Sequence, residues 1–279
     1  MRLSLFGHPL SHSLSPAMHN AALAELGLDG WQYVPAPVPP SGLAEAVARL
    51  RADDHAGANV TVPHKRAVVA LLDGVTPVAH AIGAVNTIVK QAGRLIGHNT
   101  DAAGLLADLY AHDVRLSRRP VLILGAGGAA RAAVAALAGV GARVRVVARR
   151  PEQAAALRPI AALEVFEWTA LGLLTASDEV ALIINTTPLG MTPNTDASPW
   201  LEGTPFPPDA FVYDLVYNPP DTLFVRQARA AGLRAATGLG MLVEQGALAL
   251  ELWTGRQAPR ATMRQAAEAI LYRPVTGFT

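Results

Sequence analysis

Short apolar runs alternate with segments of helical periodicity along the first hundred residues. The apolar runs predict strands at residues 3–6, 32–36 and 58–62. Helical spacing of hydrophobic positions predicts helices at residues 16–26, 43–50, 65–72 and 77–82. A hairpin of residues 84–89 and 94–97 completes this part. Strands interleaved with helices are typical of an α/β lobe with a mostly parallel sheet.

The same pattern continues into a second lobe. An amphipathic helix from Asp101 to about His112, with Asn99 and Thr100 as cap residues, leads into it. The continuous apolar run 120–124 is typical of a strand buried on both faces. Further strands are expected at residues 143–147, 181–185, 210–215 and 233–236, with helices between several of them. This order predicts a doubly wound sheet.

Two helices, 241–253 and 261–271, follow the last expected strand. They are expected to return to the first lobe. We therefore predict one domain of residues 1–101 and 238–279, and a second domain of residues 102–237.

Composition excludes several classes of function. The chain has 279 residues, 51% of them hydrophobic, and a formal net charge of +1, so neither nucleic acid nor a membrane is expected as a partner. It has no cysteine, which excludes disulfides and thiolate chemistry. The N-terminus does not resemble a secretory signal, and the apolar segment 132–142 is shorter than the ~20 residues of a membrane span. A soluble cytoplasmic protein is the expectation.

Positive charge is supplied almost entirely by arginine. Of 23 basic residues only Lys65 and Lys90 are lysines. Arginine does not release its proton in the working pH range, whereas a partly buried lysine can, so a retained lysine is a candidate for chemistry. Lys90 lies in what reads as a solvated hairpin turn and is interpreted as incidental. Lys65 has polar neighbours and is the stronger candidate.

A dinucleotide site is indicated where the run 120–124 meets a glycine-rich turn. Gly125, Ala126, Gly127, Gly128 and Ala129 precede a helix that continues to Leu137. In the G-x-G-x-x-A pattern the first glycine permits a tight turn and the second lets a pyrophosphate approach the backbone. The free N–H groups of the helix start favour an anion. A purely structural glycine-rich turn is the alternative.

The end of the next strand distinguishes the two nicotinamide cofactors. NAD-binding units usually place a carboxylate there, which bonds the ribose hydroxyls and repels a 2′-phosphate. This chain has Ala148 followed by Arg149 and Arg150, which can bind a phosphate. The sequence therefore favours NADP, although a solvated arginine pair is the simpler reading of those two residues.

Four polar segments are not explained by core packing: 7–16, 59–65, 86–87 and 99–101. Closely spaced hydroxyls beside a helix start suit a carboxylate or a polyol, and the other segments add amide, hydroxyl, amine and carboxylate groups. Each segment taken alone is also consistent with ordinary turn or cap residues.

Together these segments resemble the shikimate dehydrogenase family over nearly the whole chain. Ser13-Leu14-Ser15-Pro16 resembles the family's Ser-x-Ser-Pro loop, and the resemblance implies that its two serines hold the substrate carboxylate. The stretch 59–65 resembles Asn-Val-Thr-x-Pro-x-Lys, which implies that Thr61 binds substrate and that Lys65 is catalytic. The segments 83–87 and 97–101 match two further motifs. They imply that Asn86 and Asp101 contact ring hydroxyls and that Asp101 partners Lys65.

The second lobe carries three more matching motifs, at residues 185–191, 214–219 and 238–245. By resemblance, Tyr217 and Gln245 reach the substrate, and Met241 lies against the nicotinamide. The cofactor residues expected from pattern and resemblance together are Gly125, Ala126, Gly127, Gly128, Ala129, Arg149, Arg150, Thr187, Leu215, Gly238 and Met241. One departure is Ala148, where many family members have asparagine, so the NADP prediction depends on the two arginines.

The resemblance implies a two-domain oxidoreductase with an N-terminal α/β substrate domain and a Rossmann-type NADP-binding domain. The expected reaction is the reversible, NADP-dependent reduction of 3-dehydroshikimate to shikimate in chorismate and aromatic amino acid biosynthesis. Lys65 either transfers the hydroxyl proton or mainly orients the substrate and stabilises negative charge. A monomer or a homodimer is expected.

Four alternatives stay open at this point. The first is a quinate or dual quinate/shikimate dehydrogenase, and the second, more distant, is a folate-interconverting dehydrogenase. The third is a non-catalytic NADP-binding sensor, since fold alone does not establish activity. The fourth is a metal enzyme, which is disfavoured because His8, His12 and His19 lack a carboxylate-rich ligand set and are explained by loop or capping roles.

Overall fold

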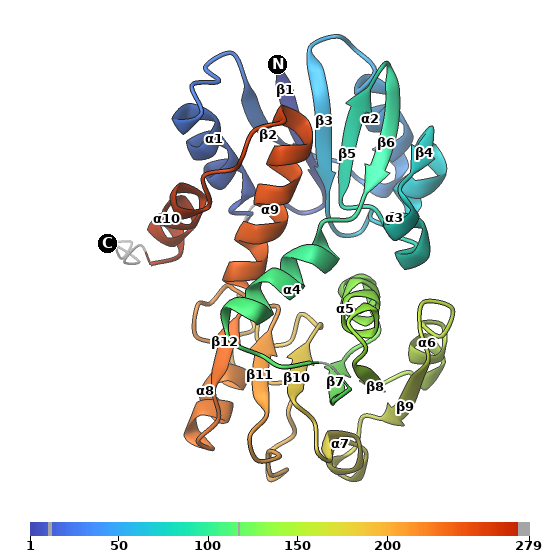
Figure 1. Cartoon of the computed structure of the whole chain (residues 1–279), viewed down its shortest axis with the longest axis vertical. Helices are drawn as coiled ribbons and strands as arrows, with labels where there is room; N and C mark the ends of the chain where they lie inside the picture. Colours follow the sequence, from blue (N-terminus) through green and yellow to red (C-terminus); the bar gives the residue numbers. More distant parts are fainter. Residues whose placement is uncertain (11–12, 117, 273–279) are drawn as a thin grey trace. The chain divides into compact units, whose positions relative to one another are not determined.

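A computed structural model describes residues 1–10, 13–116 and 118–272 of the chain (Figure 1). Ser11 and His12, in the first polar segment, lie outside the described residues. The chain forms two compact units. The first contains Met1–Thr76, Val85–His98 and Gly246–Thr279, and the second contains Pro77–Ala84 and Asn99–Gln245.

The first unit contains a mixed six-stranded sheet in the order β2-β1-β3-β5-β6-β4. Its strands are β1 (Arg2–Gly7), β2 (Gln32–Pro37), β3 (His55–Val60), β4 (Gly74–Val75), β5 (Thr87–Gln91) and β6 (Arg94–His98). Strand β1 pairs in parallel with β2 and β3, whereas β5 is antiparallel to both β3 and β6. Strand β4 pairs in parallel with β6, so three of the five pairings are parallel, as expected, and the two antiparallel pairings of β5 make the sheet mixed. Ala92 and Gly93 both have positive φ in the β5–β6 turn, and strands joined by so short a turn are antiparallel.

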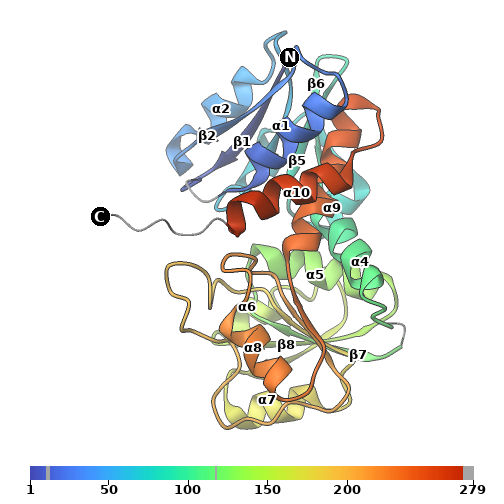
Figure 2. The same ribbon diagram turned by 90° about the vertical axis from the view of Figure 1, so that its left-hand side faces the viewer.

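The helices of this unit are α1 (Ser15–Glu25), η1 (Pro40–Gly42), α2 (Leu43–Arg49), η2 (Ala67–Leu71), the C-terminal part of α9 (Leu239–Thr254) and α10 (Arg260–Leu271). Helix α10 packs along α1, which confirms the expected return of the C-terminal helices (Figure 2). The helix predicted at 65–72 is wrong. The Lys65 carbonyl accepts a hydrogen bond from the Val85 N–H, and Val69 N–H bonds to Arg66, so only a short 3-10 turn forms.

Helix α9 makes a close contact with the first sheet. The Trp253 indole N–H donates to the Ile88 carbonyl (2.9 Å), and a Cβ built on Gly57 would lie 2.5 Å from the same indole nitrogen. Only glycine fits there. Lys90, interpreted as a solvated turn residue, instead belongs to β5 and donates to the Arg51 and Ala52 carbonyls just after α2.

His19 belongs to the core of the first unit. It lies on α1, is fully buried, and stacks on Tyr33 with ring centroids 4.3 Å apart. Trp253 flanks it at 5.6 Å. The loop or capping role expected from the sequence is wrong for this residue, since the aromatic cluster fixes its position. Neither ring nitrogen has a hydrogen-bond partner among the described residues.

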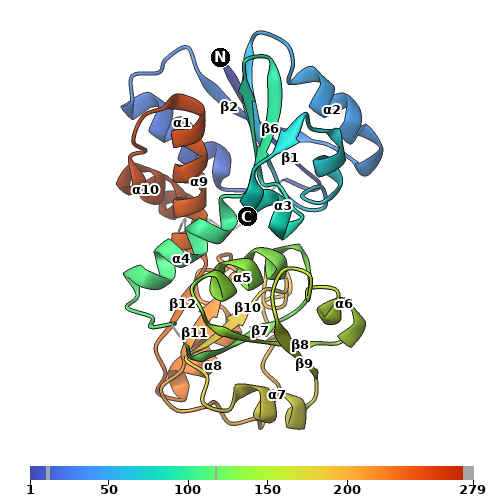
Figure 3. The same ribbon diagram turned by 45° about the vertical axis from the view of Figure 1, so that its right-hand side comes forward.

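The second unit contains an all-parallel sheet in the order β12-β11-β10-β7-β8-β9, which confirms the doubly wound prediction (Figure 3). Its strands are β7 (Pro120–Leu124), β8 (Arg143–Ala148), β9 (Leu163–Glu167), β10 (Leu182–Asn185), β11 (Phe211–Asp214) and β12 (Ala235–Thr237). Strand β9 was not expected from the sequence. It is an edge strand in which no residue is buried, so it lacks the apolar run that marks the central strands.

Side chains that alternate along these strands enter two separate cores. Val121 and Ile123 belong to one core with residues of α4 (Asp101–Ala111), α5 (Gly128–Gly139) and α6 (Pro151–Ala155). Leu122 and Leu124 belong to the other core with residues of α7 (Ala170–Ser177) and α8 (Leu223–Ala230). Both faces of β7 are thus covered, as its continuous apolar sequence requires. The short helix α3 (Pro77–Ile82) packs on α5.

None of the helices in the described ranges is both long enough and apolar enough to span a bilayer.

His19 makes the stability of the first unit depend on pH. Burial lowers its pKa to about 3, against about 6.5 in an unfolded chain. Between these values the unfolded chain binds a proton that the native state does not, so the stability contribution is complete above pH 6.5 and decreases below it. At pH 5 we expect the free energy of unfolding to be lower by about 2 kcal/mol from this group.

The measurement is urea unfolding at pH 8 and pH 5 for the parent, His19→Leu and His80→Leu, an exposed control. Only His19→Leu should reduce the difference between the two pH values. An unchanged difference in that variant contradicts the assignment.

Candidate active site

In the first unit, three strand ends bring the predicted substrate residues to one edge of the sheet. Strands β1 and β3 end there, and the antiparallel strand β5 begins there, with Asn59 and Thr87 as register partners. Ser13 and Ser15 follow β1, Thr61 follows β3, and Asn86 directly precedes β5.

The serine segment forms a tight turn into α1. The Ser13 N–H donates to the Leu10 carbonyl, and the Ser15 N–H lies 3.3 Å from Ser13 Oγ. Pro16 occupies the first turn, where its missing N–H has no cost. The turn therefore presents hydroxyls beside the N–H groups of a helix start, an arrangement suited to an anion.

Thr61 and Lys65 are held close to the same edge by main-chain hydrogen bonds. The Thr61 N–H donates to the Phe6 carbonyl (2.8 Å), and the Lys65 carbonyl accepts from Val85 (2.8 Å). Both side chains are half-buried. Gly7 adjoins Thr61 so closely that a Cβ would overlap the Thr61 methyl group.

A buried polar network that the sequence analysis missed lies beneath this edge. Tyr33, Asn59, Thr87 and Asn86 are each at most 6% exposed and are linked by hydrogen bonds of 2.9–3.1 Å. Burial raises the pKa of Tyr33. Polar residues on strands that otherwise read as apolar were the available signal.

In the second unit, the glycine-rich turn lies between β7 and α5, as expected. Gly125 has φ +106°, a conformation that favours glycine, and a Cβ there would lie 2.6 Å from the Thr187 methyl group. A Cβ on Gly127 or Gly128 would meet no atom within 4 Å. The start of α5 is thus open to a phosphate, which fits the pyrophosphate of a dinucleotide.

The neighbouring loops place the remaining expected cofactor residues at the same edge of this sheet. Arg149 and Arg150 are exposed after β8, and Thr187 follows β10. Leu215 follows β11, and Gly238 follows β12. These two residues are so close that a Cβ built on Gly238 would lie 2.5 Å from the Leu215 carbonyl oxygen. The carboxyl ends of parallel strands are where such sheets bind nucleotides.

A buried carboxylate organises these loops. Asp214 is 0% exposed and accepts hydrogen bonds from Asn185 Nδ2 (2.8 Å), the Val216 N–H (3.0 Å) and the Thr222 hydroxyl (2.7 Å). Asn185 Oδ1 in turn accepts from the N–H and hydroxyl of Thr187. Burial raises the pKa of Asp214 to about 6, against the opposing effect of its three donors.

Asp101 and Gln245 lie on two helices that approach closely within the second unit. A Cβ on Gly104, one turn after Asp101, would lie 2.8 Å from Gln245 Cβ. Met241, on the first turn of α9, packs against the core, and Tyr217 is half-buried with its pKa raised by burial. Asp101 is buried at the start of α4.

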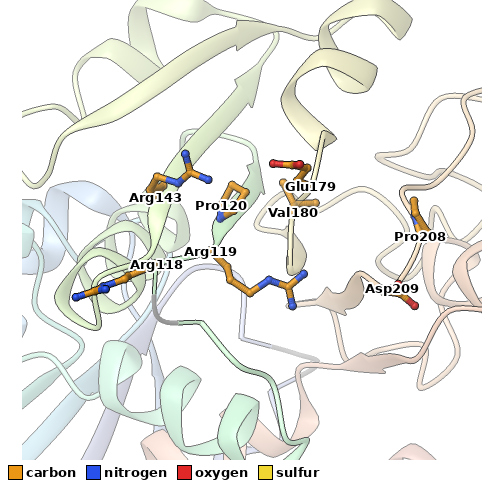
Figure 4. Close-up of a pocket in the computed structure, with 8 residues that line it drawn as sticks. All are labelled: Arg118, Arg119, Pro120, Arg143, Glu179, Val180, Pro208 and Asp209. Carbon is orange, nitrogen blue, oxygen red and sulfur yellow. The ribbon is translucent and has the colours of Figure 1, made fainter.

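The opposite edge of the second sheet holds a different feature. A hollow of about 440 Å³ opens near the start of β7 (Figure 4). It is lined by exposed side chains of both charges, including Arg119, Arg143, Glu179 and Asp209. Exposed charges are well solvated, so we place the candidate active site at the carboxyl edge instead. Among the described residues, no three His, Cys, Asp or Glu side chains are grouped to hold a metal ion.

The fold and these sites define a two-domain α/β oxidoreductase with a Rossmann-type nucleotide domain. Residues 5–88 match the model of the shikimate dehydrogenase substrate binding domain, and residues 238–268 match that of the shikimate 5′-dehydrogenase C-terminal domain. Relatives that are 46% and 42% identical over 96% of the chain belong to the same family. The chain therefore belongs to the shikimate dehydrogenase family.

Known relatives cover nearly the whole chain. Shikimate dehydrogenase (NADP(+)) of Symbiobacterium thermophilum is 46% identical over 96% of this chain and 94% of the relative. The crystal structure of shikimate 5-dehydrogenase from Thermus thermophilus in complex with NADP(H) and shikimate is 42% identical, with a TM-score of 0.88 over 96% of this chain and 99% of that one. Quinate dehydrogenase from Corynebacterium glutamicum in complex with NAD is 29% identical, with a TM-score of 0.88 over 96% and 99% of the two chains.

The Asp214 network predicts a measurable loss of stability. Asp214→Ala leaves three buried donors without their acceptor, which should lower the free energy of unfolding by about 3 kcal/mol. The control is Asp221→Ala, a nearby carboxylate that is half-exposed and paired with Arg229. That change should cost less than about 1 kcal/mol. Equal losses in denaturant unfolding of the two variants would contradict the role of Asp214.

Proposed function

We propose that the chain catalyses the NADP-dependent, reversible reduction of 3-dehydroshikimate to shikimate. The observation that carries the proposal is the gathering of Ser13, Ser15, Thr61 and Asn86 at one edge of the first sheet. Membership of the family supports it, as does the open glycine-rich turn of the second unit.

The substrate groups have chemically matching residues in this chain. The Ser13 and Ser15 hydroxyls donate to the carboxylate, while Thr61, Asn86, Asp101, Tyr217 and Gln245 bind the remaining polar groups of the ring. Lys65 acts at the oxygen that changes between ketone and hydroxyl. It donates to that oxygen as negative charge develops, and it holds the proton in the reverse direction.

The residues that bind the cofactor lie in the turn and loops at the carboxyl edge of the second sheet. The N–H groups of the turn Gly125–Ala129 hold the pyrophosphate, and the loops carrying Thr187, Leu215, Gly238 and Met241 surround the nicotinamide. Bound NADP supplies or accepts the hydride. Arg149 and Arg150 bind the 2′-phosphate, since the last residue of β8 is Ala148 rather than an acid. The chain acts as a monomer or a homodimer, with shikimate or 3-dehydroshikimate as its small-molecule substrate.

The direct test is nicotinamide reduction by purified protein with shikimate and NADP, alongside quinate and NAD. We expect turnover with shikimate and NADP to exceed every other pair by at least about tenfold. Comparable turnover with quinate would instead favour the dual-specificity alternative. Absence of turnover in a protein that still binds NADP would favour the sensor alternative and overturn the proposal.

The arginine pair predicts the cofactor preference. The double variant that combines Arg149→Ala and Arg150→Ala should have a KM for NADP about 10- to 100-fold higher, because it loses charge-assisted hydrogen bonds to the phosphate. KM for NAD should change by less than about threefold, because NAD has no 2′-phosphate. Arg158→Ala, an exposed arginine after α6, is the matched control. A parallel increase in KM for both cofactors would argue against phosphate recognition.

A further inference from the structure

Helix α4 lies against the first turns of α9 within the second unit, and each helix has a glycine where it meets the other (Figures 1 and 3). A Cβ built on Gly104 of α4 would lie 2.7 Å from the main-chain nitrogen of Gln245 and 3.0 Å from its Cα. A Cβ built on Gly240 of α9 would lie 1.9 Å from Asp108 Oδ1 on α4. All three distances are shorter than a van der Waals contact, so neither position has room for a side chain.

The backbone conformation of these two glycines does not itself require glycine. Neither Gly104 nor Gly240 has a positive φ, and both lie within helices. In the interior of a helix, glycine is less stable than alanine by about 0.5–1 kcal/mol. Local preference therefore favours alanine at both positions, and the close approach of the other helix is what excludes it.

The face of α4 that meets α9 begins with Asp101. Residues three, four and seven positions apart lie on one face of an α-helix, so Asp101, Gly104 and Asp108 form one row. The last two residues of this row contact α9. Asp101, the first residue of α4, therefore lies on the same side of the helix, one turn before the contact with Gln245.

Hydrogen bonds hold α4 at both ends of this row. Asn99 Oδ1 accepts from the Asp101 N–H (3.1 Å), and Asn99 Nδ2 donates to the Ala84 carbonyl (3.0 Å). At the other end, the hydroxyl of Tyr213 on β11 donates to Asp108 Oδ2 (2.5 Å). Because α4 is fixed in this way, a side chain inserted between the two helices would displace α9 or distort α4.

We infer that Gly104 and Gly240 are positioning residues that set how closely α4 approaches α9. This approach fixes the separation between Asp101 and Gln245, and so the spacing of two groups that bind the substrate ring. The inference rests on the proposed function for the roles of those two residues. A methyl group at position 104 would add about 1 Å to the separation, since non-bonded carbon and nitrogen atoms rarely approach more closely than about 3.5 Å. Neither glycine needs to touch the substrate.

The first test adds one methyl group. Gly104→Ala should lower kcat/KM for shikimate about 10- to 100-fold, because a displacement of about 1 Å misplaces both binding groups. KM for NADP should change less than about threefold, because the phosphates of the cofactor are held by other elements. The matched control is Gly139→Ala at the end of α5, where a Cβ would meet no neighbouring atom within 4 Å. Its kinetics should equal those of the parent.

Two outcomes of this test overturn the inference. One is an unchanged kcat/KM for shikimate in a folded Gly104→Ala protein. The other is a rise in KM for NADP as large as the loss for shikimate, which is the sign of a general distortion of the second unit.

The second test uses the other contact, where the methyl group would meet a side chain instead of main chain. Gly240→Ala should lower kcat/KM for shikimate at least as much as Gly104→Ala. Asp108→Ala removes the carboxylate that the new methyl group would overlap. The double variant of Gly240→Ala and Asp108→Ala should therefore recover kcat/KM to within about threefold of Asp108→Ala alone.

The control for this recovery is Gly104→Ala combined with Asp108→Ala. It should show no recovery, because the methyl group at position 104 meets the main chain of Gln245. If the Gly240→Ala double variant does not recover, or if both double variants recover equally, the inference is wrong. Should Gly104→Ala not fold, the Gly240→Ala comparison decides the question alone.

A third measurement separates this inference from the proposed function. Crystal structures of the parent and of Gly104→Ala, both without ligands, give the distance between the Cα atoms of Asp101 and Gln245. This distance should be about 1 Å longer in the variant. An unchanged distance overturns the inference even where the parent turns over shikimate. If the distance increases but the parent turns over no shikimate, the proposed function fails and the steric role of Gly104 stands.

Discussion

In each sheet, a buried asparagine near the end of one strand is held by hydrogen bonds to main-chain carbonyls. Asn59 near the end of β3 donates to the Asn86 carbonyl, and Asn185 at the end of β10 donates to the Leu189 carbonyl and the Asp214 carboxylate. The Leu189 carbonyl, the Asp214 carboxylate and the Asn86 carbonyl accept hydrogen bonds and have no hydrogen to donate. Neither amide can therefore be flipped without leaving buried groups unpaired, at a cost of about 1–3 kcal/mol each.

This anchoring explains how loops can serve as binding elements. The loop after β10 belongs to no helix or strand, yet Thr187 is bonded to Asn185 through both its N–H and its hydroxyl. Asp214 links the same asparagine to Val216 and to Thr222, the N-cap of α8. One buried carboxylate thus bonds to two loops and to the start of one helix. These hydrogen bonds hold the loops in place where no strand pairing does so.

The sequence predicts correctly those elements whose conformation depends on one local property of their residues. The apolar run of β7 follows directly from burial, and the turn at Gly125 follows from its positive φ. It predicts less well where tertiary contacts compete with local preference. The Lys65 carbonyl bonds to Val85 across the fold and so cannot support a helix, and the buried position of His19 is set by Tyr33 and Trp253.

The contacts within the polar network of the first unit could not be predicted from the sequence for a related reason. Tyr33 and Asn59 are 26 residues apart, and nothing in either segment states that their side chains meet. Asn59, Asn86 and Thr87 belong to segments that resemble the family motifs, whereas Tyr33, which bonds Asn59, lies outside them. The main-chain carbonyl of Asn86, which no substitution removes, fixes the orientation of the Asn59 amide.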